Sequence, residues 1–353
     1  MKKTLLLLTL LTFFGWANAQ YKVLLVDDDM NGSDESFRID TALAHSGYSY
    51  SFINIDTNAA PSYDDMKGYD MVIWTTANDG MNLNLWDSTT LAGGPAKFND
   101  ALMQYLDSGN VVWLDGIDFI YDIYGKAPDT FSPGDFVYDV MGIAKYLAQS
   151  HADDTLGSYS GCPLAQKAAS NNVTNIDTIK WKWSSLWYAD AYELAPKAVS
   201  LYEMGPAGYD FAGKSMALYN GNLIVSTLRI GSIGDGNGNY DQNTIDALVK
   251  QMVQAAENGT FAKLPGGFGD KAVKPTVKVY PNPALNQISF EMPQSRDAEI
   301  YIYDISGKLV SQTAVNQGNT TVTMNVSNLK AGLYFYKVLI NKTPVTGKFS
   351  VMR

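Results

Sequence analysis

The sequence predicts a chain of two folded parts, an open α/β domain with a mainly parallel sheet and a small all-β sandwich after it. The first part is predicted because apolar runs alternate with helical patterns from Gln20 to about residue 262. The second is predicted from period-two alternation, such as Glu-Ile-Tyr-Ile-Tyr-Asp at 299–304, which places successive side chains on opposite faces of a strand. A stretch rich in Gly and Pro lies between the two parts.

The apolar runs and helical patterns of the first part define its expected elements in order. We expect strands at 21–26, 48–55, 69–74 and 110–115, with helices at 36–46 and 95–107 between them. A strand pair at 214–228 and a closing helix from Asp241 complete this part. Strands separated by helices are typical of an open, mainly parallel, flavodoxin-like sheet with helices on both faces.

Four segments with different roles are expected along the chain. Residues 1–19 have Lys2 and Lys3, an apolar run and an Ala-Asn-Ala ending, the pattern of a secretory signal peptide. The α/β domain is assigned to 20–262, with 117–212 as a less regular insertion or cap. A linker at 263–276 then leads to the sandwich at 277–353.

Composition excludes several classes of function. The formal net charge is −10, and removal of Lys2 and Lys3 with the signal peptide makes it −12. An acidic protein repels phosphate backbones, so no nucleic acid partner is expected. The single cysteine, Cys162, excludes an internal disulfide and any zinc site built of cysteines. No segment after the signal peptide is long and apolar enough to span a membrane.

Three turn-containing motifs mark the second part. They occur in a fixed order between stretches of alternating residues, and their principal members are Tyr280, Pro281, Asn282, Pro283, Tyr303, Asp304, Gly307, Lys308, Gly332 and Tyr334. In this order they resemble the type A C-terminal sorting domain of the type IX secretion system of certain Gram-negative bacteria. An ordinary immunoglobulin-like binding module is the alternative for a sandwich of this size.

The resemblance implies a destination and two partners. A sorting domain is recognised by the outer-membrane translocon and is removed by a sortase-like peptidase, with release of the protein or attachment to the surface. We therefore expect a secreted or cell-surface protein that passes through the periplasm. A glycan is the candidate ligand that the sequence offers.

The order of elements in the first part resembles the class I glutamine amidotransferase-like fold. The matching segments are 23–29, 71–75 and 111–116. Active members need a nucleophilic Cys at the turn after the third segment, with a His and an acid. Here that turn contains no Cys, Ser or Thr, and the two histidines are His45 and His151. The resemblance therefore implies a degenerate domain without the Cys-His-Glu triad, and a Cys162–His151 pair is the less favoured alternative.

Acidic residues are the candidates for any remaining catalysis. Asp27, Asp28 and Asp29 follow the first predicted strand, and Asp115 and Asp118 follow the fourth. Open α/β sheets bind ligands at this edge, where converging carboxylates act as acid and base or hold a cation. The alternative is that these residues cap turns and helices.

Two stretches are partly similar to calcium-binding loops. Asp27-x-Asp29-x-Asn31-Gly32 begins correctly, but Arg38 occupies the twelfth position, where an acid is required. The second has oxygen-bearing residues at alternate positions but Tyr240 at the turn position, and consists of Asp235, Asn237, Asn239, Asp241 and Asp246. A Gly/Asn loop followed by a helix cap is the favoured interpretation. No cofactor is expected, apart from a possible structural calcium ion.

Aromatic residues are crowded at 181–192. They are suited either to a platform that stacks on sugars or to a core, and are Trp181, Trp183, Trp187, Tyr188 and Tyr192.

Two functions of different classes remain open. We expect an exported, non-catalytic binding protein. The alternative is a secreted hydrolase that uses the acidic edge, with or without a metal ion.

Overall fold

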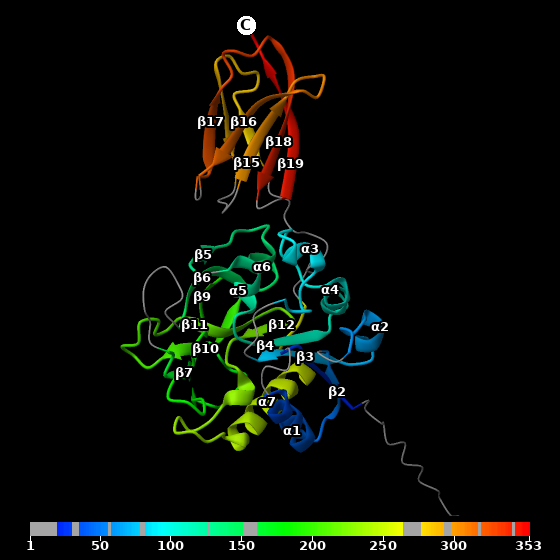
Figure 1. The fold of residues 1–353 in the computed structure, drawn as a ribbon, viewed down its shortest axis with the longest axis vertical. Coiled ribbons are helices and arrows are strands. Elements are labelled where there is room, and N and C mark those ends of the chain that lie inside the picture. The colour runs from blue at the N-terminus through cyan, green and yellow to red at the C-terminus, as the bar shows by residue number, and fades with distance from the viewer. Residues whose placement is uncertain are drawn as a thin grey trace, which may run out of the picture.

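The computed structural model describes residues 20–29, 35–55, 58–77, 82–125, 127–150, 161–263, 277–292, 298–316, 319–340 and 343–353. The predicted signal peptide and nearly all of the predicted linker lie outside these residues. Figure 1 shows a large sheet with helices on both faces and, nearer the end of the chain, a sandwich of strands. We call residues 20–262 the body and residues 277–353 the sandwich.

Five neighbouring strands of the body run parallel. Their order is β2-β1-β3-β4-β12, and their bounds are β1 Lys22–Asp27, β2 Ser49–Asn54, β3 Met71–Ala77, β4 Val111–Gly116 and β12 Leu223–Ser226. Strands β3, β4 and β12 are buried along their whole length. Burial on both faces explains why these strands read as continuous apolar runs.

The remaining strands of this sheet pair antiparallel. The path continues from β12 through β11, β10, β7 and β8, while β9, β6 and β5 branch from β11. Their bounds are β5 Asp129–Thr130, β6 Ile143–Gln149, β7 Leu164–Lys167, β8 Thr178–Ile179, β9 Asp190–Leu194, β10 Val199–Gly205 and β11 Ser215–Asn220.

The prediction of a mainly parallel, flavodoxin-like sheet is wrong. Four strand pairings in the large sheet are parallel and seven are antiparallel. Among the described residues 39% lie in strands and 19% in helices. The error came from segment 117–212, expected to be an irregular insertion, which supplies six of the antiparallel strands. Among them β5, β7 and β8 have only two to four residues, and register shifts interrupt the pairing of β6 with β9 and of β10 with β11, so their sequences show no regular alternation.

Helices cover both faces of the large sheet. Their bounds are α1 Ser36–Ser46, α2 Tyr63–Met66, α3 Ser88–Leu91, α4 Asp100–Asp107, α5 Phe119–Tyr124, α6 Phe136–Asp139 and α7 Gln242–Glu257, with a 3-10 turn, η1, at Ile230–Ser232. Apolar residues of α1 and α7 share one core with Val23 and Leu25, whereas those of α4 share another with Leu24 and Val26. Alternate residues of one strand therefore face different helices.

The predicted sandwich is confirmed. One sheet contains β13 Lys278–Tyr280, β14 Gln287–Glu291 and β17 Thr321–Asn325. The other has the order β16-β15-β18-β19, with β15 Ala298–Tyr303, β16 Leu309–Val315, β18 Gly332–Ile340 and β19 Thr343–Val351. All pairings within both sheets are antiparallel, and side chains such as Ile300, Phe290 and Phe349 form a separate core between them.

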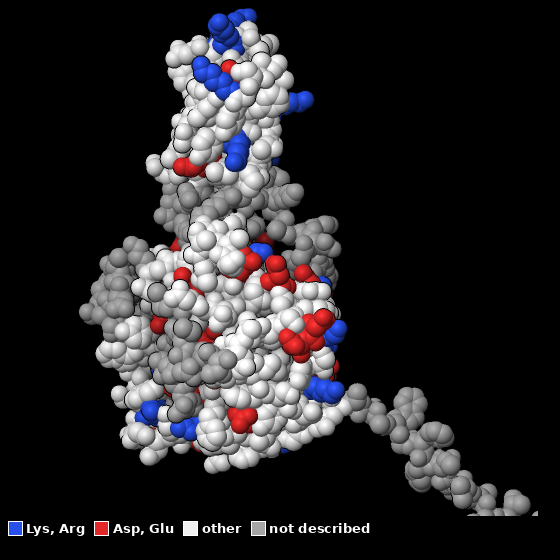
Figure 2. Space-filling view, turned by 45° about the vertical axis from the view of Figure 1, so that its right-hand side comes forward, with Lys and Arg blue, Asp and Glu red and all other residues white. Residues whose placement is uncertain are grey.

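The body and the sandwich carry opposite charge. Residues 20–262 contain 13 Lys and Arg against 31 Asp and Glu, a balance of −18, whereas residues 277–353 contain 8 against 4, a balance of +4. On the face drawn in Figure 2, acidic side chains predominate over the body and basic ones over the sandwich.

A close backbone contact joins η1 to the residue before α1. A Cβ atom at Gly231 would lie 2.4 Å from the carbonyl oxygen of Glu35, closer than real Cβ atoms approach backbone. Glycine is therefore required here by the lack of space rather than by its backbone angles.

We expect Gly231→Ala to destabilise the body by about 1–3 kcal/mol, because the added methyl group must displace the backbone of Glu35. Urea unfolding followed by tryptophan fluorescence measures the change. Gly68→Ala is the matched control, since nothing lies within 4 Å of its added Cβ. Equal stability of the two variants would contradict this account.

Candidate functional site

The carboxyl ends of β1, β3, β4 and β12 meet at one edge of the sheet because these strands are neighbours and parallel. Backbone hydrogen bonds link the chain just beyond the strand ends, from Asp28 N to Thr75 O (2.9 Å) and from Ile117 N to Ala77 O (3.0 Å). The five predicted catalytic candidates lie at this edge. What each carboxylate contacts determines what the edge can do.

Asp28 is buried and accepts four hydrogen bonds. The donors are Trp74 Nε1 (3.0 Å), the backbone and side-chain nitrogens of Asn84 (3.3 and 2.9 Å) and the backbone nitrogen of Leu85 (3.1 Å). Burial raises the pKa of the Asp28 carboxyl to about 6, and these hydrogen bonds partly oppose the rise. Both carboxylate oxygens are thus occupied in holding the segment after β3.

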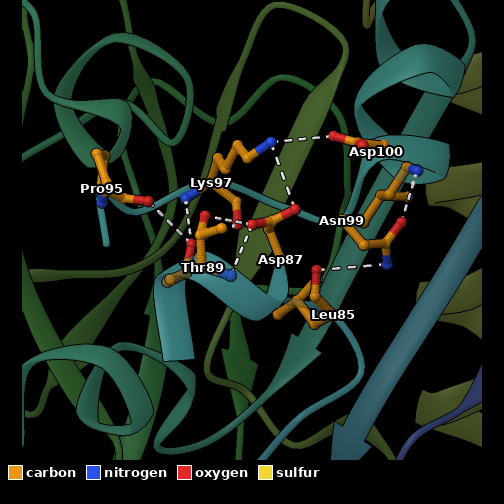
Figure 3. A network of polar contacts seen from close by, with 9 residues as sticks. Leu85, Asp87, Thr89, Pro95, Lys97, Asn99 and Asp100 are labelled. Carbon is orange, nitrogen blue, oxygen red and sulfur yellow. Dashed lines mark hydrogen bonds and ion pairs between the residues drawn. The ribbon is translucent and has the colours of Figure 1, made fainter. Parts of the chain in front are cut away.

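The segment that Asp28 holds continues into a surface network (Figure 3). Asp87 accepts a hydrogen bond from Thr89 N (2.8 Å) and caps α3, and Asn99 accepts one from Leu102 N (2.9 Å) and caps α4. Lys97 Nζ lies between Asp87 (3.4 Å) and Asp100 (3.0 Å). Each polar group in this network serves the turns and helix ends of residues 85–100, so the network is structural.

Asp27 connects three elements. Its Oδ2 accepts hydrogen bonds from Ser36 Oγ (2.8 Å), in the first turn of α1, and from Asn54 Nδ2 (3.1 Å), at the end of β2. Asp29 is also buried. Asn31 and Gly32, which would continue the predicted calcium loop from Asp27, lie outside the described residues.

Asp115 is fully buried at the end of β4. It accepts hydrogen bonds from Ser226 Oγ (2.8 Å) and from Ile230 N (2.9 Å), which tie β4 to β12 and to η1. Burial raises the pKa of the Asp115 carboxyl to about 7.

Asp118 and Asp190 lie in a second polar cluster. Asp118 has a left-handed backbone (φ 66°) before α5 and accepts a hydrogen bond from Gln149 Nε2. Asp190, on β9, accepts one from Tyr192 OH (2.8 Å), and burial raises the pKa of its carboxyl to about 7. The sequence analysis did not single out Asp190, because nothing in the sequence marks an isolated acid as buried.

Glu35 and Arg229 form a half-buried ion pair that the sequence analysis also missed. Arg229 Nε and Nη2 donate to the two oxygens of Glu35, both at 2.7 Å, and Ser232 Oγ donates to the same carboxylate. Such bidentate pairs fix orientation as well as charge. The two residues are 194 positions apart, so no local pattern could have indicated the pair.

The predicted metal-loop residues serve different elements. Asp235 accepts hydrogen bonds from Asn237 N (2.7 Å) and Asn239 Nδ2 (2.8 Å) within one turn. Asp241 caps α7 through Thr244 N (3.1 Å), and Asp246 pairs with His45 Nδ1 (2.7 Å). Within the part of the chain that the structure describes, no three His, Cys, Asp or Glu residues are grouped as metal ligands.

Cys162 is not placed as a nucleophile. Its thiol is buried, its sulfur lies 3.2 Å from Leu164 O, and burial raises the pKa of the thiol to about 12. His151 lies outside the described residues.

The aromatic segment divides between core and surface. Trp181 and Tyr192 are buried, whereas Trp183 and Trp187 are 38% and 52% exposed. Tyr188 is half-buried. A continuous stacking platform of all five residues is therefore absent from this segment, all of which is described.

The sorting motif residues form the turns of the sandwich. Asp304 accepts hydrogen bonds from Ser306 N (2.8 Å), Ser306 Oγ (2.6 Å) and Lys308 N (3.1 Å), and Gly307 has φ 81°. The hydrogen bonds with Ser306 lower the pKa of the Asp304 carboxyl. This turn follows Tyr303 at the end of β15 and leads into β16.

The other motif residues hold the ends of the strands. Asn282, between Pro281 and Pro283 and after Tyr280, accepts a hydrogen bond from Ser350 N (3.0 Å). Tyr334 follows Gly332, stacks on Phe349 and donates its hydroxyl hydrogen to Lys330 O (2.9 Å). Arg353 donates to the carbonyl oxygens of Val326 and Ser327, both at 2.8 Å.

A family model described as "Secretion system C-terminal sorting domain" matches residues 278–352. Residues 278–352 are a type IX secretion sorting domain. The sorting domain indicates a secreted or cell-surface protein and implies interaction with the secretion machinery. Both agree with the expectation drawn from the three motifs. No curated protein matches the chain.

Several solved structures are similar to parts of this chain. One is a DUF3244 family protein with an immunoglobulin-like β-sandwich from Bacteroides vulgatus (19% identity, 21% of this chain and 82% of that chain, TM-score 0.19). Another is a CARDB domain from Pyrococcus furiosus in complex with di-metal ions (16%, 22% and 93%, TM-score 0.16). A third is the BSP domain of a biofilm associated protein (15%, 38% and 26%, TM-score 0.20).

These comparisons do not support the amidotransferase resemblance of the body. The family match lies within the sandwich and gives the body no support for that resemblance. Together with the mainly antiparallel pairing of the large sheet, this removes the basis for an amidotransferase-like fold. Among the described residues, no helix has the length and apolar character needed to cross a membrane.

We expect Asp190→Asn to change how the stability of the body depends on pH. The folded-state pKa of Asp190 is about 7, above the unfolded value of 3.8. Preferential protonation of the folded state therefore contributes its full amount to the free energy of unfolding below about pH 4, and this contribution is lost as the pH rises to 7. Between pH 4 and pH 8, the free energy of unfolding of the variant should rise relative to that of the native chain by on the order of 2–4 kcal/mol. Urea unfolding across this range measures the difference.

The exposed residue Asp100 provides the control for this experiment, because Asp100→Asn removes a carboxylate that burial does not affect. The raised pKa assigned to Asp190 would be contradicted if the difference in free energy of unfolding between Asp190→Asn and the native chain stayed constant from pH 4 to pH 8.

We expect deletion of Val277–Arg353 to leave the body in the periplasm, because residues 278–352 are the sorting domain that directs the chain to the secretion machinery. Immunoblots of periplasm, cell surface and medium measure the distribution. A folded reporter flanked by residues 1–19 and 264–353 should reach the surface. Arrival of the deleted chain at the surface would disprove the role of the sandwich.

Proposed function

We propose that the body is a non-catalytic binding module that the sorting domain carries to the cell surface or the medium. The observation behind this proposal is the use of the carboxylates at the sheet edge. Asp27, Asp28 and Asp115 each accept hydrogen bonds from a different set of donors, and these donors belong to the strands and turns around them. Carboxylates held in this way position the strands and loops around them rather than act on a substrate.

The raised pKa values of Asp28 and Asp115 have a structural explanation. A general acid or base must reach the proton that it transfers, directly or through one water molecule. Asp115 is fully buried beneath Ser226 and Ile230, and Asp28 beneath Trp74 and Leu85. Their pKa values therefore reflect burial, and perturbed values alone do not identify a catalytic pair.

Nucleophilic catalysis by cysteine is also disfavoured. A buried thiol with a pKa of about 12 carries almost no thiolate at neutral pH, and the thiolate is the reactive form. The turn after β4 contains no Cys, Ser or Thr, and its Asp118 contacts Gln149.

In this proposal the sandwich serves export alone. The outer-membrane translocon recognises it, and a sortase-like peptidase removes it once the body is outside. The opposite charge of the two parts supports this division, since a body of −18 and a sandwich of +4 present different surfaces to partners.

The test compares binding with turnover in the full chain. Surface polysaccharides and proteins are offered to the purified protein, binding is measured by biolayer interferometry, and each bound ligand is then weighed by mass spectrometry. We expect a ligand to be retained with its mass unchanged. Asp115→Asn should affect stability but not the affinity of the folded protein.

A secreted hydrolase would give a different result. Its ligand would be cleaved with time, and Asp28→Asn or Asp115→Asn would slow cleavage by about 100-fold or more while the chain stays folded. That outcome would refute the proposal and support the acidic-edge alternative.

A further inference from the structure

Five side chains of the body form a cationic–aromatic cluster, made up of Arg38, Lys182, Trp183, Arg229 and Tyr240. The guanidinium carbon of Arg38 lies 3.3 Å from the ring centre of Tyr240, and Lys182 Nζ lies 4.5 Å from it. Lys182 Nζ and the guanidinium carbon of Arg229 lie 4.7 and 4.8 Å from the ring centre of Trp183. Three cations thus share two aromatic rings.

The cluster is assembled from segments that are held rigidly. Lys182 N donates to Ser232 O (2.9 Å), and Gly238 N donates to Lys182 O (2.6 Å), so the backbone around Lys182 is fixed against the chain that leads to Tyr240. A Cβ at Gly234 would lie 2.6 Å from Lys182 Cα, which shows how closely the segments approach. Gln242 Nε2 donates to Arg38 O (3.0 Å) and fixes the first turn of α1.

The cluster concentrates positive charge in an acidic body. Residues 20–262 contain only two arginines, and both Arg38 and Arg229 lie in the cluster. Arg229 is neutralised by Glu35. Arg38 and Lys182 pair with no carboxylate among the described residues, and the buried Nε of Arg38 has no hydrogen-bond partner. Two cations of the cluster therefore have no carboxylate partner within the described part of the body.

The hydroxyl of Tyr240 lies in a positive electrostatic potential. Partial burial alone would raise the pKa of its hydroxyl, but the hydrogen bond to Lys182 (2.7 Å) and the nearby Arg38 outweigh burial and lower the pKa. The surroundings of Tyr240 thus favour negative charge.

The cluster is accessible from solvent. Trp183 is 38% exposed, and Arg38, Lys182 and Tyr240 are half-buried. Half-buried cations with an exposed aromatic face are suited to a ligand that carries both an anionic group and an apolar surface.

We propose that this cluster binds the carboxylate of an acidic sugar residue in a glycan, with Arg38 and Lys182 contacting the carboxylate and Trp183 contacting the sugar ring. This inference rests on the proposed binding function and names its ligand class. Two unpaired cations match one carboxylate group. A long polyanion such as nucleic acid is disfavoured, because the rest of the body would repel it.

The test uses the full chain and oligosaccharides of galacturonic acid, with the matching galactose oligosaccharides as the neutral probe and galactose 6-phosphate as the phosphate probe. Isothermal titration calorimetry measures affinity. We expect binding of the galacturonic acid probe and at least about tenfold weaker binding of the neutral probe. Galactose 6-phosphate that binds more tightly than galacturonate would overturn the assignment of a carboxylate.

Substitutions locate the site. Arg38→Met and Lys182→Met should each weaken binding of galacturonic acid about tenfold or more, whereas Lys182→Arg retains charge and should bind within a few-fold of the native chain. Lys67→Met is the matched control, because it removes one charge from an exposed ion pair with Asp64 elsewhere on the body. Circular dichroism establishes that each variant is folded.

The outcomes separate this inference from the proposed function. Tight binding of a neutral glycan that Lys182→Met does not affect would overturn the acidic-sugar assignment and leave a non-catalytic binder. Cleavage of the probe would overturn the proposed function itself. Equal loss of affinity in Lys67→Met and Lys182→Met would show that overall charge, not the cluster, governs binding, and would also overturn the inference.

Discussion

Burial of carboxylates at the carboxyl edge of the parallel strands is the constraint on which the body depends. A buried carboxylate is tolerated only when donors surround it, so the loops beyond β1, β3, β4 and β12 are shaped to supply them. Asp28 receives backbone nitrogens from the segment after β3, and Asp115 receives one from η1. The edge where open sheets commonly place a ligand site is here occupied by the protein's own hydrogen bonds.

The predictions that succeeded concern segments whose structure is determined by their own residues. The strands at 22–27, 71–77 and 111–116 were recognisable because burial on both faces demands continuous apolar runs. The sandwich was recognisable because its strands alternate and its turns need particular residues, such as Gly307 at positive φ. Where local chemistry sets the structure, the sequence was sufficient.

The rest depended on contacts between distant residues. Of the antiparallel strands between Asp129 and Gly205, β5, β7 and β8 have two to four residues, and the pairing of β6 with β9 and of β10 with β11 shifts in register. No regular period identified these strands, and the predicted mainly parallel sheet was wrong. The pairing of Glu35 with Arg229, and the approach of Arg38 to Tyr240, join positions about 200 residues apart. Single-sequence patterns carry no information on such pairs, nor on the donors that the buried carboxylates of Asp27, Asp28 and Asp115 contact.

The unequal distribution of charge between body and sandwich has a practical consequence. Loss of residues 277–353 takes away eight cations and four anions, so the net charge of a chain that lacks residues 1–19 would pass from −12 to −16. The shortened form should focus at a lower isoelectric point and elute later from an anion-exchange column. Processing could thus be followed on native material by its chromatographic retention, without antibodies or tags.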